Sequence, residues 1–271
     1  MSIHERYGYR ENPFLNLPDY EYFVQTDQHI SALILGTKTM VDDDGFAVLT
    51  GPFGSGKTIV AEGVAAEVRN RAWFCGQFSD PTNWTTPNAM LSTFLEEHKI
   101  ELEGRPNQQA RENALLARWN SRVESGSKVC YIIDEAHRMR PKILEKIMML
   151  GNNTIKIKGK TRRLVNFFLV GQEPLEKKVS KLPDFENRIG ANRQALTGAD
   201  ENDLKTMIES RMKKFASKRC KPIFTDASLD ELIKLAKGSP RLMFSIAGNC
   251  LWKANGKPIS VELVHKEAIH V

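Results

Sequence analysis

The sequence predicts an α/β fold with a parallel central sheet covered by helices, followed by a small C-terminal helical domain. Between residues 45 and 199, short runs that are apolar at every position alternate with helical segments, as in sheets buried on both faces. A glycine-rich loop joins the first of these runs to a helix. From Asp200 onward the strand pattern disappears and only helical segments follow.

The elements follow in this order. The N-terminal part mixes proline, asparagine and aromatic residues, then continues as a helical run from Asp27 to Met40 that ends at the acidic turn DDDG. Five apolar runs predict central strands: GFAVLT (45–50), AWFCGQF (72–78), VCYIID (129–134), LVNFFLV (164–170) and RQAL (193–196). C-terminal helices are predicted at 200–218, 226–237, 240–255 and 260–269. The expected parts are an N-terminal segment (1–44), an α/β domain (45–199) and a helical domain (200–271).

Composition limits the class of protein. A chain of 271 residues with 41% hydrophobic content is long enough to bury a substantial core. Its four cysteines lie far apart without a C-x-x-C pair, which favours free thiols over disulfides or a metal site. No apolar run is long enough to span a membrane, and MSIHERYGYR is too polar for a secretory signal. We expect a cytoplasmic protein without membrane contact.

The net charge of +6 is unevenly distributed. Residues 1–140 carry 14 basic and 19 acidic side chains, whereas residues 141–271 carry 25 and 14. A basic half of this size suggests attraction to nucleic acid or to an acidic partner, but a solvated lysine-rich surface gives the same count. Composition alone leaves both readings open.

Residues 51–58 read GPFGSGKT and match the phosphate-binding pattern G-x-x-x-x-G-K-[ST], with a predicted strand before and a helix after. The glycines let backbone N–H groups face the phosphates of ATP, Lys57 neutralises the β and γ oxygens, and the Thr58 hydroxyl helps to hold Mg²⁺. This context favours an ATP site over a chance turn. The predicted nucleotide-binding residues in this stretch are Gly51, Pro52, Phe53, Gly54, Ser55, Gly56, Lys57, Thr58 and Ile59.

The second half of the site is predicted at the end of VCYIIDE. Asp134 would hold the metal through water and Glu135 would polarise the attacking water, so hydrolysis of the β–γ bond is the expected reaction. His137 completes the motif DEAH, and a metal-ligand role for it is disfavoured because no second histidine lies nearby. A DEAH helicase needs a second motor domain and further motifs that this sequence lacks. We therefore expect no strand separation.

These motifs resemble those of the AAA+ ATPases, within the branch of the ExeA-type secretion ATPases and the TnsC/TniB-type transposition regulators. The resemblance spans most of the chain and rests on NPF (12–14), PDYEYF (18–23), GPFGSGKT, IIDEAH, FFLVGQEPLEKKV, ENRI and GSPR. It implies a P-loop domain with a helical lid (200–271) and an aromatic N-terminal segment near the adenine. Simple core packing would also explain those aromatic residues.

The resemblance also implies roles for residues outside the loop. Gln172 looks like the first sensor, placed between the activated water and the γ-phosphate. Arg188 looks like an arginine finger that reaches the nucleotide of the adjacent subunit, with Arg193 as the alternative. Arg241 resembles the second sensor, which reports the nucleotide state, although each arginine can also be an ordinary surface residue. A finger acting across a subunit boundary implies a homo-oligomer, either a ring or a helical filament.

A basic segment, NTIKIKGKTRRLV, leads into the predicted strand LVNFFLV (164–170). Its alternation of Ile and Lys fits a strand with one basic face, and Gly159-Lys160 would turn it into a hairpin. Such a hairpin would contact DNA phosphates without reading sequence; the alternative is a solvated edge. The predicted contact residues are Lys156, Lys158, Lys160, Arg162 and Arg163. Weaker candidates are RMKKFASKRCK (211–221) and SDPTNWTTPN (79–88).

We expect an ATP-dependent regulator that oligomerises on double-stranded DNA and recruits a transposase or another recombination protein. The alternatives are a secretion-type ATPase that assembles an envelope complex without DNA, and a replication-initiator or helicase-loader role. The basic C-terminal half favours the first hypothesis. Secretion ATPases usually carry a membrane span and appended domains, and initiators usually carry a separate DNA-binding domain.

Overall fold

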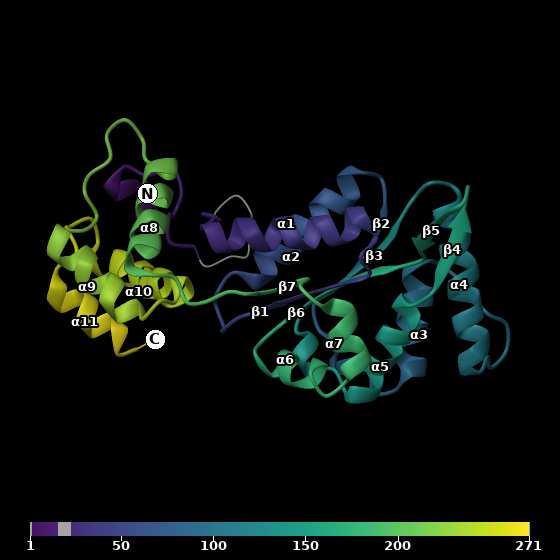
Figure 1. Ribbon diagram of the computed structural model, residues 1–271. Helices are drawn as coiled ribbons and strands as arrows, with labels where there is room; N and C mark the ends of the chain where they lie inside the picture. Colours follow the sequence, from purple (N-terminus) through teal and green to yellow (C-terminus); the bar gives the residue numbers. More distant parts are fainter. Residues whose placement is uncertain (1, 16–22, 271) are drawn as a thin grey trace. The chain divides into compact units, whose positions relative to one another are not determined.

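Residues 2–15 and 23–270 are described by the structure, a computed structural model (Figure 1). The chain forms two units by its internal contacts, and each is described by itself. The α/β unit comprises Asp27–Gly51 and Lys57–Leu196. The helical unit comprises Met1–Thr26, Pro52–Gly56 and Thr197–Val271. Of the motif PDYEYF, all but Phe23 lies outside the described residues.

The five apolar runs form one parallel sheet in the order β2-β3-β6-β1-β7. Every residue of β1, β3 and β6 is buried, which confirms the predicted α/β fold with a sheet covered on both faces. Because the strands run in the same direction, the segments that follow β1, β3 and β6 leave the sheet at one edge. The strands are β1 (Phe46–Thr50), β2 (Phe74–Phe78), β3 (Val129–Ile133), β6 (Asn166–Gly171) and β7 (Arg193–Ala195).

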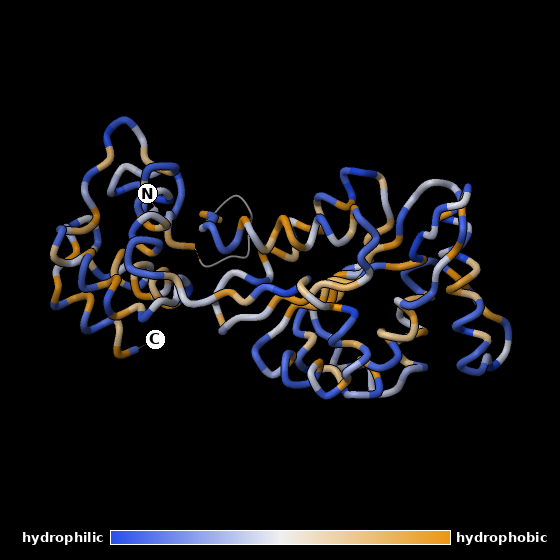
Figure 2. Tube along the Cα trace, viewed as in Figure 1, coloured by the Kyte–Doolittle hydropathy of each residue, from blue (hydrophilic) through white to orange (hydrophobic). Residues whose placement is uncertain are grey.

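Helices pack on both faces of this sheet, and alternate strand residues face the two layers (Figure 1). Leu49 and Phe168 pack with α1 (Asp27–Asp42) and α2 (Lys57–Asn70), whereas Phe167 packs with the helices of the opposite face. Figure 2 shows apolar residues concentrated along the strands of this unit. Each helix of the second layer begins with proline or just after an asparagine cap. They are α3 (Pro87–Glu97), α4 (Gln108–Glu124), α5 (Pro141–Gly151), α6 (Pro174–Val179) and α7 (Pro183–Ile189).

The helical unit contains the four C-terminal helices predicted from the sequence. Each helix begins directly after a residue whose side chain accepts a hydrogen bond from the backbone N–H three residues later. Because Asp, Ser and Thr favour this capping position, the helix starts can be predicted from the sequence. These caps are Asp200, Thr225, Ser239 and Ser260. The helices are α8 (Glu201–Phe215), α9 (Asp226–Ala236), α10 (Pro240–Ala254) and α11 (Val261–Ala268).

The N-terminal aromatic residues belong to the core of the helical unit. Tyr7, Tyr9 and Phe14 are buried there, and Tyr9 forms an antiparallel bridge with Ala216. Core packing therefore accounts for these side chains, and their proximity to adenine stays a prediction. The helix α1 belongs instead to the α/β unit, because its residues Ala32 and Met40 pack into the core beneath the sheet. The segment expected over 1–44 is thus divided between the two units.

The basic segment forms the predicted antiparallel hairpin, a two-stranded sheet of its own, from β4 (Thr154–Ile157) and β5 (Lys160–Arg163). Its turn lies at Lys158 and Gly159, one residue earlier than expected. Both residues have left-handed φ angles, 50° and 79°. Two successive left-handed residues give the tight turn whose twist matches antiparallel strands.

The cysteines are free thiols, as the sequence predicted. Cys130 and Cys250 are buried, and burial raises the pKa of Cys250 to about 12.

Among the described residues, no helix combines the length and the apolar character that crossing a membrane requires.

His98 joins two helices to the sheet inside the α/β core. It is 5% exposed, and its Nε2 accepts hydrogen bonds from Trp119 Nε1 and from the Tyr131 hydroxyl, each at 2.9 Å. Phe74 stacks on the imidazole with a centroid separation of 3.9 Å. Burial lowers the pKa of His98 to about 3, so the folded protein holds the neutral ring.

Acidification should destabilise the fold through His98. The unfolded chain takes up this proton near pH 6.5, so the contribution is complete above that pH and is lost as the pH falls toward 3. The measurement is urea unfolding of the parent and of His98→Gln between about pH 7 and 5. As the pH falls, the free energy of unfolding should decrease in the parent by up to about 1.4 kcal/mol per pH unit more than in the variant. Parallel pH profiles for the two proteins would contradict this expectation.

Candidate functional site

The phosphate-loop sequence connects β1 to α2. Gly54 and Gly56 have left-handed φ angles of 77° and 85°, which residues with a side chain rarely adopt. Within the loop, Ser55 donates from its backbone N–H and from its hydroxyl to the Pro52 carbonyl, at 3.3 and 2.9 Å. The chain then enters α2 at Lys57. A glycine-rich turn that opens a helix presents unsatisfied backbone N–H groups, which suits an anion.

The first residues of α2 lie against the acid that ends β3. The Thr58 hydroxyl donates a 2.7 Å hydrogen bond to Asp134 Oδ2. Lys57 is 6% exposed, and burial lowers its pKa while Asp134 and Glu135 oppose that shift. Asp134 is also buried, and its backbone N–H donates to the Phe78 carbonyl at 2.8 Å. A lysine, a hydroxyl and a carboxylate thus meet at one edge of the sheet.

Adjacent hydroxyl and carboxylate oxygens suit Mg²⁺, which prefers oxygen ligands. Thr58 and Asp134 supply such a pair. In the described part of the chain, no three His, Cys, Asp or Glu side chains gather in an arrangement for a metal ion. His137 therefore belongs to no such cluster.

Glu135 has an unusual backbone and an engaged carboxylate. Its φ of 51° is left-handed, and its N–H donates to Asp134 Oδ1 at 2.8 Å. Residues held in this conformation concentrate at functional sites. Oε2 of Glu135 lies 3.2 Å from Arg138 Nε and 3.6 Å from His137 Nε2. Arg138 also pairs with Asp80 at 3.2 Å.

Gln172 follows β6 and lies beside this group. Its backbone N–H donates to His137 Nδ1 at 3.3 Å, so His137 stands between Gln172 and Glu135. Five residues predicted from the sequence therefore lie at one edge of the sheet: Lys57, Thr58, Asp134, Glu135 and Gln172. Sequence reasoning missed the contacts of His137, Arg138 and Asp80, because their partners are distant in the chain or appear only when the DEAH turn is folded.

The two candidate finger residues differ in their surroundings. Arg188 is exposed on α7, and no described acidic residue pairs with it. Arg193 pairs with Glu176 at 3.3 Å and donates from Nε to the Gly190 carbonyl at 3.1 Å. Arg193 is therefore already engaged within its own chain, whereas Arg188 is accessible to a neighbour.

Arg241 lies at the start of α10 in the helical unit. Its guanidinium stands 4.6 Å from the centroid of the Phe53 ring. A Cβ on Gly54 would lie only 3.2 Å from Arg241 Cβ and 3.3 Å from Ser239 Oγ, so a glycine permits this close packing. The sequence offered no signal for the Phe53 contact.

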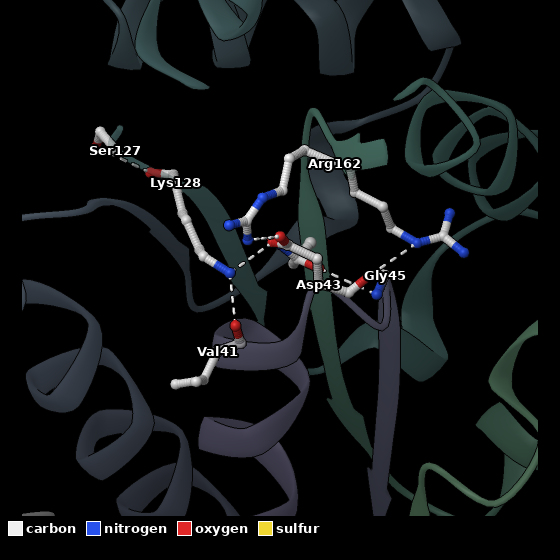
Figure 3. Close-up of polar contacts among 8 residues, drawn as sticks. Val41, Asp43, Gly45, Ser127, Lys128 and Arg162 are labelled. Carbon is white, nitrogen blue, oxygen red and sulfur yellow. Dashed lines mark hydrogen bonds and ion pairs between the residues drawn. The ribbon is translucent and has the colours of Figure 1, made fainter. Parts of the chain in front are cut away.

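The base of the basic hairpin is fixed by Asp43 (Figure 3). Its carboxylate pairs with Lys128 at 2.8 Å and with Arg162 at 3.0 Å. Arg163 donates from Nε to the Asp43 carbonyl at 3.1 Å and from Nη1 to the Gly151 carbonyl at 2.8 Å. Two of the five predicted DNA contacts are thus engaged in holding the hairpin. The other three, Lys156, Lys158 and Lys160, are exposed and have no ion-pair partner among the described residues.

Comparisons with known proteins agree with this geometry. A family model described as an AAA domain matches residues 40–179, more than half of the chain. General secretion pathway protein A from Aeromonas hydrophila is 24% identical over 261 residues, which cover 96% of this chain and 46% of that protein. The chain thus spans about half the length of this relative. This finding agrees with the secretion side of the resemblance, and the TnsC/TniB side stays a prediction.

Solved structures show the same fold. The ORC2 protein of Aeropyrum pernix, in its ADPNP-ADP complexes, has a TM-score of 0.67 at 18% identity, over 97% of this chain and 72% of that one. Cdc6p from Pyrobaculum aerophilum has a TM-score of 0.70 at 16% identity, over 93% and 71%. The Aeropyrum pernix ORC1 protein in complex with DNA has a TM-score of 0.68 at 16% identity, over 97% and 69%. The chain belongs to the AAA domain family, and its fold is that of the AAA+ P-loop ATPases.

Proposed function

We propose that this chain hydrolyses ATP to ADP and phosphate and that ATP controls its assembly on double-stranded DNA. One observation carries the enzymatic part: the Thr58 hydroxyl donates a 2.7 Å hydrogen bond to Asp134. Lys57, which is buried, and Glu135, which is half-buried, are the chain neighbours of these two residues. Lys57 and Thr58 follow a glycine-rich loop and the two acids follow β3, at the edge of a parallel sheet where such folds bind their ligands. The assembled protein would recruit a transposase or another recombination protein.

Each residue of the site has a role in this proposal. The loop from Gly51 to Gly56 and Lys57 bind the phosphates. Thr58 and Asp134 would hold Mg²⁺, which when bound neutralises charge on the phosphate oxygens. Glu135 polarises the attacking water.

The remaining polar groups act on the γ-phosphate. Gln172 positions the water against it, and Arg241 reports the nucleotide state from the helical unit. Arg188 of a neighbouring subunit stabilises the charge on the transferred phosphoryl group. The exposed position of Arg188 and the ion pair of Arg193 support this choice between the two arginines.

The DNA-binding part of the proposal relies on the hairpin. Lys156, Lys158 and Lys160 are exposed on it, while Asp43 and two arginines hold its base in place. A firmly held row of lysines suits contact with phosphates without sequence preference.

A second candidate function is favoured by one observation. The relative identified by sequence carries a name from the general secretion pathway. In that case the same ATP-driven assembly would act on an envelope complex through protein contacts, and the hairpin lysines would be a solvated edge.

Two substitutions test the hydrolytic site. Glu135→Gln should bind ATP with affinity close to that of the parent, because glutamine has the same shape as glutamate. It should hydrolyse ATP at least about 100-fold more slowly, because the amide cannot act as the general base for the attacking water. Lys57→Ala should lose nucleotide binding. Equilibrium binding of a fluorescent ATP analogue and phosphate release measure the two properties, and thermal unfolding of each variant serves as the control. Normal turnover by Glu135→Gln would refute the role of this acid.

The finger can be assigned by mixing variants. Arg188→Ala should lower hydrolysis by about 1,000-fold or more while isolated subunits still bind nucleotide. Arg193→Ala should have a much smaller effect, because Arg193 is engaged with Glu176. Mixing inactive Arg188→Ala with inactive Lys57→Ala should restore phosphate release, since the second variant supplies the arginine and the first supplies the nucleotide site. Absence of recovery in mixtures that co-assemble would rule out action in trans.

Sedimentation velocity tests the assembly. With a non-hydrolysable ATP analogue and a random-sequence duplex of about 60 base pairs, large species should form that need both ligands and shrink at high salt. Replacing Lys156, Lys158 and Lys160 by Gln should reduce the slope of log affinity against log salt by up to about 3. A matched triple variant, Arg105→Gln with Lys142→Gln and Lys181→Gln, removes the same charge from exposed positions elsewhere. Assembly that ignores DNA would favour the secretion role.

A further inference from the structure

His137 lies between the end of β6 and the carboxylate of Glu135. Its Nδ1 accepts the backbone N–H of Gln172 at 3.3 Å, so the ring proton of the neutral imidazole is on Nε2. Nε2 faces Glu135 Oε2 at 3.6 Å. Within the described chain, only His137 and Arg138 contact this carboxylate, and both do so through Oε2. No described residue pairs with Oε1.

The backbone of His137 is held from two sides. The Lys178 ammonium donates to the His137 carbonyl, and to the Met139 carbonyl at 2.7 Å. At Gly171 the strand passes so close that a Cβ would lie 3.0 Å from the backbone nitrogen of His137 and 3.4 Å from its Cβ. The His137 side chain is 14% exposed, and burial lowers its pKa against the opposing effect of Glu135. The ring is therefore neutral at neutral pH.

We propose that His137 is a positioning residue for Glu135. In this structure Nε2 lies 3.6 Å from Oε2, just beyond hydrogen-bond distance. In the ATP-bound state this contact tightens to a hydrogen bond from Nε2–H, which directs Oε1 toward the attacking water. The inference rests on the proposed ATP hydrolysis and adds a residue to it. A displacement of a reacting group by about 1 Å can lower the rate about 100-fold, so a residue that orients this carboxylate is expected to affect kcat. Because Nδ1 is bound to the Gln172 backbone, the orientation of Glu135 is also tied to the strand that carries Gln172.

Arg138 is less suited to this role. Its side chain is 47% exposed, and it shares its charge between Glu135 and Asp80. Exposed ion pairs are screened by solvent and hold their geometry weakly.

Two isosteric substitutions separate the contacts of the ring. His137→Asn keeps an acceptor for the Gln172 N–H and loses the donor toward Glu135, whereas His137→Gln keeps a donor that reaches Glu135. We expect kcat to fall by at least about tenfold in His137→Asn with KM for ATP unchanged, and to recover to within about threefold of the parent in His137→Gln. Arg138→Gln, the comparison variant, should change kcat by less than either.

Three results would overturn the proposal. One is parental kcat in His137→Asn, and another is an equal loss in both variants that follows a loss of thermal stability. The third is a larger loss in Arg138→Gln than in His137→Asn, which would assign the orienting role to the arginine.

A double-mutant cycle tests whether His137 acts through Glu135. In a Glu135→Gln background, His137→Asn should leave the residual rate within about twofold, because the group being positioned is already gone. Multiplying losses would show an independent role and contradict the inference.

A readout without hydrolysis separates this inference from the proposed function. In protein labelled with ¹⁵N-histidine, the His137 ring should show a protonated Nε2 and an unprotonated Nδ1, and the Nε2 shift should move in Glu135→Gln. A protonated Nδ1 would overturn the inference even in an active ATPase. Absence of hydrolysis in the parent protein would instead overturn the proposed function, while this signal would still report the contact.

Discussion

Parallel pairing of β1, β6 and β3 is the constraint on which the candidate site depends. Their registers align Phe46 with Phe167 and Cys130 with Asn166, so the three strands end at the same edge. The chain that leaves β1 becomes the phosphate loop, and the chain that leaves β3 begins with Asp134. Alternate residues of these buried strands pack in two different layers, so a slip of one residue would exchange the layers and disrupt the close packing of both. The spacing of the chemical groups is therefore set by the core.

The edge of the sheet carries a connected set of polar contacts. Thr58 binds one oxygen of Asp134, the Glu135 N–H binds the other, and His137 lies between Glu135 and the end of β6. The contacts of Thr58 and Gln172 join α2 and β6 to the turn after β3, so a shift of β6 or α2 would change the surroundings of the acids.

The basic residues of the hairpin differ in whether they have partners within the chain. The carboxylate of half-buried Asp43 pairs with Lys128 and with Arg162, and its carbonyl accepts a hydrogen bond from Arg163. An acid with a left-handed φ of 61° at the end of α1 thus anchors a segment more than a hundred residues later. Lys156 of β4, Lys158 of the turn and Lys160 of β5 stay outside this network. Of five basic residues that are equivalent by composition, two therefore hold the hairpin and three are exposed to solvent.

The sequence by itself determined the strands, the capped helices, the phosphate loop and its partner acid, because these depend on local pattern: apolar runs, capping side chains and a glycine-lysine spacing. Tertiary structure alone decided which basic residues were engaged, that Tyr7 and Phe14 enter the core of the helical unit, and that His137 stands between Glu135 and Gln172. Those outcomes depend on which segments distant in the chain come within hydrogen-bonding distance, a property that no local pattern contains.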